Sequence, residues 1–351
     1  MKYPKTFSIL TICYFACTTV TAQSMLEQYF GGDKDKLIKE ATKLIHTPEP
    51  TFIPVFRTTT ADTQVIADIG LDQVYKSKTR IFTARDKNRI FAYRFQKRSR
   101  NTIILIHGVA SVAYLYNKTA GLLREATGAE VFAIDLRGHG KSEGKSGDVE
   151  YIDQYSDDLA DIISVIRKEK PKGKIIIAGH SMGGGIALRY AMKKQSSQPD
   201  GFLFFAPLLG HNSPAIPQGQ SDKDSIEEAF MKIHIERIIG LKMLNEISNH
   251  EHDGLPVLFF NLPETVQLRK YSYRANMSMA PDDYAAGLKA VNKPIIVLTG
   301  SNDEAFSAEA LKKAVLENSS GEVYIVEGTS HNGIRHHQRS FEYIARWFAK
   351  L

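Results

Sequence analysis

The sequence has 351 residues, of which 43% are hydrophobic and 24% are charged, and its formal net charge is +6. These proportions are typical of a globular protein and exclude collagen-like chains, low-complexity disorder and membrane proteins with many spans. Because acidic residues accompany the 45 basic residues along the chain, we interpret the positive charge as a solvated surface and expect no nucleic-acid partner.

The first 22 residues have the pattern of a cleaved export signal. Two lysines precede a mostly apolar stretch over residues 6–20, and small residues then stand where signal peptidase would cut, before Gln23. Both cysteines of the chain, Cys13 and Cys17, lie in this segment, so the mature protein would contain no disulfide. We therefore expect a protein exported to the periplasm or the extracellular space. The alternative is a lipid anchor at Cys17, although the residues before this cysteine match a lipoprotein signal poorly.

The following segment, residues 23–77, is expected to be a helical extension. Residues 25–46 have apolar side chains at a helical period that is interrupted at Gly31 and Gly32. Three prolines then end the helical pattern, at Pro48, Pro50 and Pro54. No motif in this extension indicates a function.

From residue 78 onward, short apolar strands alternate with segments of helical period. The strands are expected at residues 80–83, 89–95, 102–106, 130–134, 174–178, 202–205, 294–299 and 322–326. The helices are expected at residues 114–127, 153–170, 182–193, 308–316 and 336–348. Strands that are apolar on both faces and separated by helices indicate an α/β fold with a mostly parallel central sheet flanked by helices. The first two strands would form an antiparallel hairpin at the start of this sheet.

One long segment, residues 207–291, interrupts the alternation. It is far longer than a connection between neighbouring elements requires, so we expect an inserted cap subdomain. The catalytic core would then consist of residues 78–206 and 292–351. The cap contains apolar stretches around residues 230–244 and 255–260, which either pack the cap on the core or line a pocket for an acyl chain.

The clearest chemical motif is Gly-His-Ser-Met-Gly at residues 179–183, between an expected strand and an expected helix. A serine on a sharp strand-to-helix turn needs small neighbours, because its backbone is strained and the chain passes close to adjacent segments. Such a motif arises often by chance, and it becomes informative here through its setting between a strand and a helix. Ser181 is therefore the candidate nucleophile.

A serine nucleophile needs a histidine base, and the histidine needs a carboxylate that orients it. In an open parallel sheet, reactive groups gather beyond the C-terminal ends of the strands. Asp303 and His331 each follow such a strand end, so we expect Asp303 to be the orienting acid and His331 the base. Asp135 is an alternative acid, but its earlier strand places it in another part of the site.

Acyl transfer also needs backbone N–H donors that stabilise the oxyanion. We expect one from Met182, directly after the serine, and the other from Val109, in the turn after the strand at 102–106. His107 in the same turn is expected to form structural hydrogen bonds.

Together these residues resemble the α/β-hydrolase superfamily, and within it the branch of monoacylglycerol lipases and lysophospholipases. The resemblance extends from about residue 78 to the C-terminus, and it rests on His107 and Gly108, residues 135–144, residues 179–184, Asp303 and His331. It implies an α/β-hydrolase fold in which the insertion is a lid, and it implies the same site residues: Ser181, Asp303, His331, Val109 and Met182. Leu115 stands where the lipase branch usually has an arginine, so glycerol esters are not a firm expectation.

The leading hypothesis is a secreted serine hydrolase that cleaves carboxylic esters of lipid-like or small apolar acyl substrates and uses neither a cofactor nor a metal. Peripheral contact of the cap with a lipid surface and the oligomeric state are left open. A serine peptidase or amidase of the same fold is the main alternative, and a noncatalytic binding protein is a third. A peptidase would need carboxylates that bind the substrate amine, such as Glu227, Glu228 or Glu236.

A histidine-rich stretch, residues 249–253, contains groups that can bind a metal. These groups are adjacent in sequence, and no second cluster matches them. We therefore interpret the stretch as a solvated loop of the cap.

Overall fold

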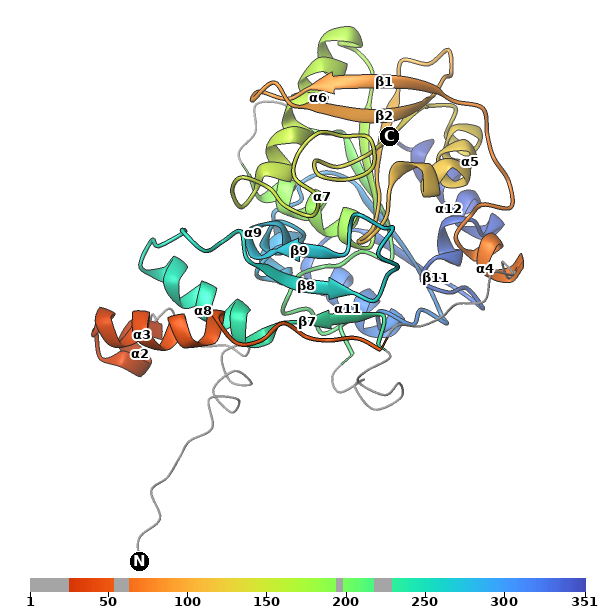
Figure 1. Cartoon of the computed structure of the whole chain (residues 1–351). Helices are drawn as coiled ribbons and strands as arrows, with labels where there is room; N and C mark the ends of the chain where they lie inside the picture. Colours follow the sequence, from red (N-terminus) through yellow and green to blue (C-terminus); the bar gives the residue numbers. More distant parts are fainter. Residues whose placement is uncertain (1–24, 54–62, 194–197, 218–228) are drawn as a thin grey trace, which may run out of the picture.

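A computed structural model describes residues 25–53, 63–193, 198–217 and 229–351 (Figure 1). The expected export signal and the two acids Glu227 and Glu228 lie outside these residues. None of the helices within the described ranges is both long enough and apolar enough to span a bilayer.

An eight-stranded sheet forms the centre of the protein (Figure 1). Its strands are ordered β1-β2-β4-β3-β5-β6-β10-β11. They are β1 (Lys78–Thr83), β2 (Arg89–Phe95), β3 (Thr102–Ile106), β4 (Glu130–Ile134), β5 (Ile175–His180), β6 (Gly201–Phe205), β10 (Ile295–Gly300) and β11 (Glu322–Val326). Strand β2 is antiparallel to both neighbours, and the pairs from β4 to β11 are parallel. The mostly parallel sheet predicted from the sequence is confirmed.

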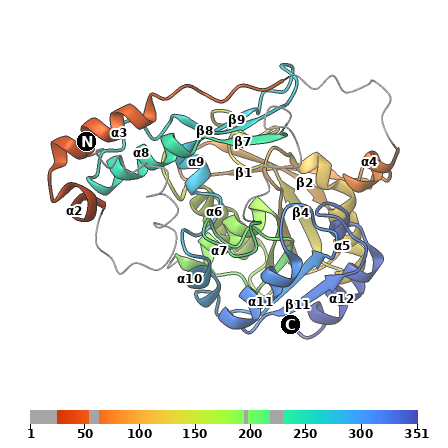
Figure 2. The same cartoon turned by 90° about the horizontal axis from the view of Figure 1, so that it is seen from below.

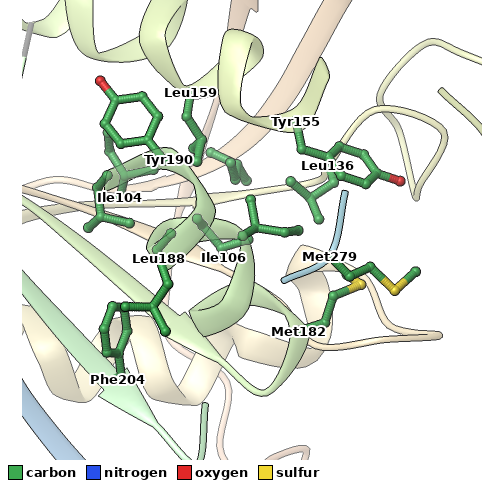
Figure 3. Packing of buried hydrophobic residues seen from close by; sticks show 14 of the residues in the cluster. Ile104, Ile106, Leu136, Tyr155, Leu159, Met182, Leu188, Tyr190, Phe204 and Met279 are labelled. Atoms are coloured by element: carbon green, nitrogen blue, oxygen red, sulfur yellow. The ribbon is translucent and has the colours of Figure 1, made fainter. Parts of the chain in front are cut away.

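Helices cover both faces of this sheet, because its strands are apolar on both sides. Three helices pack on one face: α6 (Gln154–Glu169), α7 (Met182–Met192) and α11 (Ala308–Asn318). Two pack on the other: α5 (Asn117–Thr127) and α12 (Gln338–Phe348). Figure 3 shows the first layer, where Leu159 of α6 and Leu188 of α7 lie near Ile104 and Ile106 of β3. The intervening residue Leu105 is buried on the opposite face of the sheet.

Two predicted helices begin differently from the expectation. The segment expected to start at residue 114 first forms a 3-10 turn, η1 (Ala113–Tyr116), whose first amide donates to the Asp135 carboxylate at 2.6 Å. Helix α12 starts at Gln338, because His337 caps it by accepting the Arg339 N–H at 3.2 Å. A second 3-10 turn, η3 (Gly333–Arg335), precedes this cap.

The inserted segment between β6 and β10 contains a small sheet as well as helices. Strands β7 (Met231–Ile233), β8 (Pro256–Phe260) and β9 (Lys270–Ser272) pair in an antiparallel manner. The helices are α8 (Ile235–Glu246), α9 (Tyr273–Met277) and α10 (Tyr284–Lys289). The apolar run at residues 255–260, to which the sequence assigned no strand, is the central strand of this sheet.

The N-terminal extension packs against the inserted segment. It contains α2 (Met25–Phe30), α3 (Lys34–Ile45) and α4 (Thr63–Asp68), and in both views α3 lies beside α8 (Figures 1 and 2). Leu37 and Ala41 of α3 are fully buried against Leu241 and Leu244 of α8. Gly240 permits this close approach, because a Cβ there would lie 2.8 Å from the Ala41 carbonyl oxygen. The first two helices of the extension and α8 therefore share one core.

Candidate active site

Ser181 lies on the turn between β5 and α7, at φ 51° and ψ −119°. This left-handed conformation is strained for any residue except glycine. The flanking glycines are required by close backbone contacts. A Cβ at Gly179 would lie 2.4 Å from the Gly183 carbonyl, and a Cβ at Gly183 would lie 2.4 Å from the Ile106 carbonyl oxygen. The backbone thus holds the serine at the C-terminal end of the central strands.

Asp303 and His331 follow the neighbouring strands β10 and β11 and are in contact. Nδ1 of His331 lies 2.9 Å from Oδ2 of Asp303 and 3.0 Å from Oδ1. The Asp303 side chain is fully buried, whereas 11% of the His331 side chain is exposed. The amides of Ala305 and Phe306 also donate to Asp303 Oδ1, at 2.9 and 2.8 Å. A proton on Nδ1 that is donated to this carboxylate leaves Nε2 unprotonated and basic.

The alternative acid, Asp135, is occupied elsewhere. Its carboxylate accepts the N–H groups of Ala113 at 2.6 Å and Lys141 at 2.9 Å. Burial raises the pKa of this carboxyl group above its ordinary value. Asp135 therefore fastens two loops, and Asp303 is the acid that contacts His331.

A chain of hydrogen bonds connects the serine turn to the loop that carries His331. The Gly108 N–H donates to the Tyr116 hydroxyl oxygen at 2.8 Å, and this hydroxyl lies 2.6 Å from Nδ1 of His180. Nε2 of His180 donates to the His331 carbonyl oxygen at 2.9 Å, which makes Nδ1 the acceptor. Burial holds the pKa of His180 well below its ordinary value, so the ring is neutral.

His180, the residue before Ser181, also contacts the ring of His331, with 4.7 Å between the centroids. Within the described part of the chain, the His331 ring is hydrogen-bonded to Asp303 and not to the Ser181 hydroxyl. The sequence reasoning did not identify His180 or Tyr116 as supports. The signal was present, because His180 directly precedes the candidate nucleophile and Tyr116 follows the turn of Val109 closely.

The two expected oxyanion donors lie close to the serine. A Cβ at Gly108 would be 3.4 Å from the Ser181 Cβ, so the turn that carries Val109 passes beside the serine. Met182 is the first residue of α7, and the amide of a first helical residue has no acceptor within its helix. Among the described residues, the backbone hydrogen bonds of turns, loops and helix caps do not use the N–H of Val109 or the N–H of Met182.

His107 forms structural contacts in this turn. Its Nδ1 lies 2.8 Å from the Gly108 carbonyl oxygen, and its Nε2 accepts the Leu136 N–H at 3.2 Å. Burial lowers the pKa of His107 to about 4. The ring is therefore neutral and joins two loops.

Among the groups considered for metal or amine binding, the described ones contact other partners. The described residues contain no group of three or more metal-ligating side chains. In the loop at 249–253, His250 Nδ1 lies 3.1 Å from both Asn245 Oδ1 and Asp253 Oδ2. Glu236 belongs to α8, the helix that packs against α3, and lies 3.5 Å from His234 Nδ1.

The family model described as "Serine aminopeptidase, S33" matches residues 97–337 of this chain. The matched region contains Ser181, Asp303 and His331 together with both expected oxyanion donors. The chain belongs to this family.

Proteins with sequences similar to this chain include lipases. The monoacylglycerol lipase of Mycolicibacterium smegmatis is 31% identical over 143 residues, which cover 36% of this chain and 51% of that protein. The monoglyceride lipase of Rattus norvegicus is 30% identical over 107 residues, which cover 30% of this chain and 35% of that protein. The chain therefore aligns with about half or less of the length of these lipases.

Several solved structures have the same fold as this chain. A Pyrococcus furiosus esterase has a TM-score of 0.51 and 16% identity, and the match covers 86% of this chain and 99% of that chain. The Paleococcus ferrophilus monoacylglycerol lipase has a TM-score of 0.50 and 20% identity, covering 79% and 99%. With the sheet order, these matches confirm the α/β-hydrolase fold that the sequence motifs predicted.

Proposed function

We propose that this protein is a serine hydrolase that cleaves carboxylic esters through an acyl-enzyme. The observation that carries the proposal is the 2.9 Å contact between Asp303 and Nδ1 of His331, beside a serine held at φ 51° on the strand-to-helix turn. In this arrangement the carboxylate orients the ring and stabilises the imidazolium that forms when Nε2 accepts a proton.

Each group has a defined part in the proposed reaction. Oγ of Ser181 attacks the ester carbonyl carbon while His331 Nε2 takes the hydroxyl proton. The amides of Val109 and Met182 donate to the resulting oxyanion. His331 then gives its proton to the leaving alcohol as the carbon–oxygen bond breaks, and the acyl group remains on the serine. Water attacks this acyl-enzyme by the same route, so the carboxylic acid leaves and the serine regains its proton.

Esters are favoured over peptides as substrates, although the family description refers to aminopeptidases. The relatives named as monoacylglycerol and monoglyceride lipases support an ester with a lipid-like or small apolar acyl group. An aminopeptidase needs a carboxylate near the serine that binds the free amine of its substrate. Glu236, the described candidate, instead lies beside His234 on the helix that supports the N-terminal extension.

The test compares p-nitrophenyl esters of graded chain length with aminoacyl-nitroanilides, using the purified protein. We expect ester turnover that rises from acetyl to medium acyl chains, because each buried CH₂ group contributes up to about 0.8 kcal/mol. Ser181→Ala should abolish both this turnover and labelling by a fluorophosphonate. Clear nitroanilide cleavage with no gain from acyl length would favour the peptidase, and unchanged labelling of Ser181→Ala would reject the nucleophile.

We also propose that the protein is exported after cleavage before Gln23. The charged and apolar pattern of residues 1–22 supports this proposal. Mass spectrometry of the protein from its native host should find Gln23 at the N-terminus. A lipid-modified Cys17 would support the anchored alternative instead.

Contact with a lipid surface is proposed for the cap. Large apolar side chains are exposed on and around β7, namely Phe230, Met231, Ile233 and Ile235. Such side chains favour insertion at the boundary of a lipid aggregate. Co-sedimentation with phosphatidylcholine vesicles should weaken in Ile233→Asn, and equal binding of the variant and the wild type would contradict this contact.

A further inference from the structure

We infer that Tyr271, on strand β9 of the cap, is a positioning residue for the oxyanion turn. Its hydroxyl group holds the backbone of Ala110, the residue that follows the expected oxyanion donor Val109. The inference rests on the proposed function, since it concerns the stabilisation of the oxyanion formed on Ser181.

The hydrogen bonds around the Tyr271 hydroxyl have one consistent arrangement. Its oxygen accepts the Ala110 N–H at 2.8 Å, and it lies 2.9 Å from Nε2 of His139. Nδ1 of His139 lies 2.8 Å from the Arg137 carbonyl oxygen, which only accepts, so Nδ1 carries the proton. Nε2 is then the acceptor of the tyrosine proton. Burial, together with the neighbouring His107, lowers the pKa of His139 to about 3 and keeps this ring neutral.

Ala110 needs such an external partner. Its φ of 50° lies in the left-handed region, which alanine rarely adopts and which a surrounding contact must enforce. The bond to Tyr271 fixes the peptide plane between Val109 and Ala110. The Val109 N–H lies in the preceding peptide plane, which is joined to this plane at the Val109 Cα. Without the bond to Tyr271, both planes could rotate about this Cα, and the Val109 N–H would turn away from the place where the oxyanion forms.

Tyr271 itself is rigidly held. Its side chain is fully buried, and its ring packs against Phe260 and His139 with centroid distances of 5.8 and 5.5 Å. The next residue, Ser272, donates its N–H to the Gly147 carbonyl oxygen of the core at 3.0 Å. This part of the cap therefore acts as a fixed support for the turn.

A second buried tyrosine supplies a matched control. Tyr155 of α6 is also fully buried, and its ring centroid lies 6.2 Å from that of His139. Its hydroxyl group has no hydrogen-bond partner among the described residues. Tyr155→Phe and Tyr271→Phe thus remove the same atom from neighbouring buried sites, but only the second removes a bond to the oxyanion turn.

The test measures kcat and KM of both variants with a p-nitrophenyl ester. We expect Tyr271→Phe to lower kcat by about 10- to 100-fold with KM changed by less than about twofold, because loss of an oxyanion donor itself costs about 10²–10³ in kcat. The affinity for an alkyl boronic acid, which binds as a tetrahedral adduct, should fall by a similar factor. Tyr155→Phe should match the wild type in all three quantities. Active-site titration gives the concentration of folded active sites in each sample, so that kcat is calculated per folded molecule.

A wild-type kcat in folded Tyr271→Phe, or an equal loss in Tyr155→Phe, would overturn the inference. If Tyr271→Phe does not fold, replacement of Tyr271 by 3-fluorotyrosine keeps the hydroxyl but weakens it as an acceptor, and an unchanged kcat there would equally overturn it. Ser181→Ala is measured in the same assay. Turnover that persists in Ser181→Ala would reject the proposed function, whereas its loss together with wild-type kcat in Tyr271→Phe would reject only the role of Tyr271.

Discussion

Asp303→Asn is the most informative substitution, because the structure determines which way the new amide would face. Oδ1 of Asp303 accepts the N–H groups of Ala305 and Phe306 at 2.9 and 2.8 Å, and backbone N–H groups only donate. The asparagine oxygen must stay toward these donors, so its NH₂ group would point at Nδ1 of His331. This NH₂ group would replace Oδ2, which lies 2.9 Å from Nδ1, and would repel a proton on Nδ1, although Oδ1 stays 3.0 Å away. It therefore favours the tautomer in which Nδ1 accepts and the ring proton is on Nε2. The ring could no longer take the proton of Ser181.

We expect this tautomer change to lower kcat by about 10⁴-fold, which corresponds to about 5 kcal/mol, with little change in KM. The assay is the hydrolysis of p-nitrophenyl butyrate, with melting temperatures measured in parallel. Glu304→Gln is the matched control, because among the described residues Glu304 accepts the His331 N–H at 2.9 Å and no other hydrogen bond, and an amide oxygen can accept this bond too. Activity of Asp303→Asn within tenfold of the wild type, or an inactive Glu304→Gln, would refute the reasoning.

Three further outcomes follow from the described contacts. The free energy of unfolding should fall as the pH drops from about 6.5 toward 4, because the unfolded chain binds protons that the buried, neutral rings of His107, His139 and His180 do not. His107 alone, with a pKa lowered to about 4, contributes about 3 kcal/mol to this fall, and urea denaturation at pH 7 and pH 4.5 measures the sum over the three rings. Leu37→Ala should destabilise the shared core of α3 and α8 by about 3 kcal/mol, while Lys36→Ala on the exposed side should change the urea midpoint little. Gly183→Ala should abolish ester turnover, since its Cβ would lie 2.4 Å from the Ile106 carbonyl oxygen, and wild-type kcat in this variant would contradict the tight fit.

The sequence by itself determined the parts of this protein that depend on neighbouring residues. Apolar runs such as residues 102–106 and 130–134 became strands at the predicted bounds, because every residue in them is buried on one face of the sheet or the other. The glycines around Ser181 marked a turn where a Cβ would collide with backbone. Asp303 and His331 were located by their positions after strand ends, since parallel strands bring those ends together.

Only the tertiary structure decided the contacts between distant segments. The bond from Ala110 to Tyr271 spans 161 positions, and no local pattern marks either residue as the partner of the other. The three cap strands were missed because they are short, with only three to five residues each, and their stability comes from pairing with one another. The apolar period of residues 25–46 predicted a helix, but it did not predict that α8 packs against this helix. That contact joins segments far apart in the sequence, and burial depends on the shape of the folded chain.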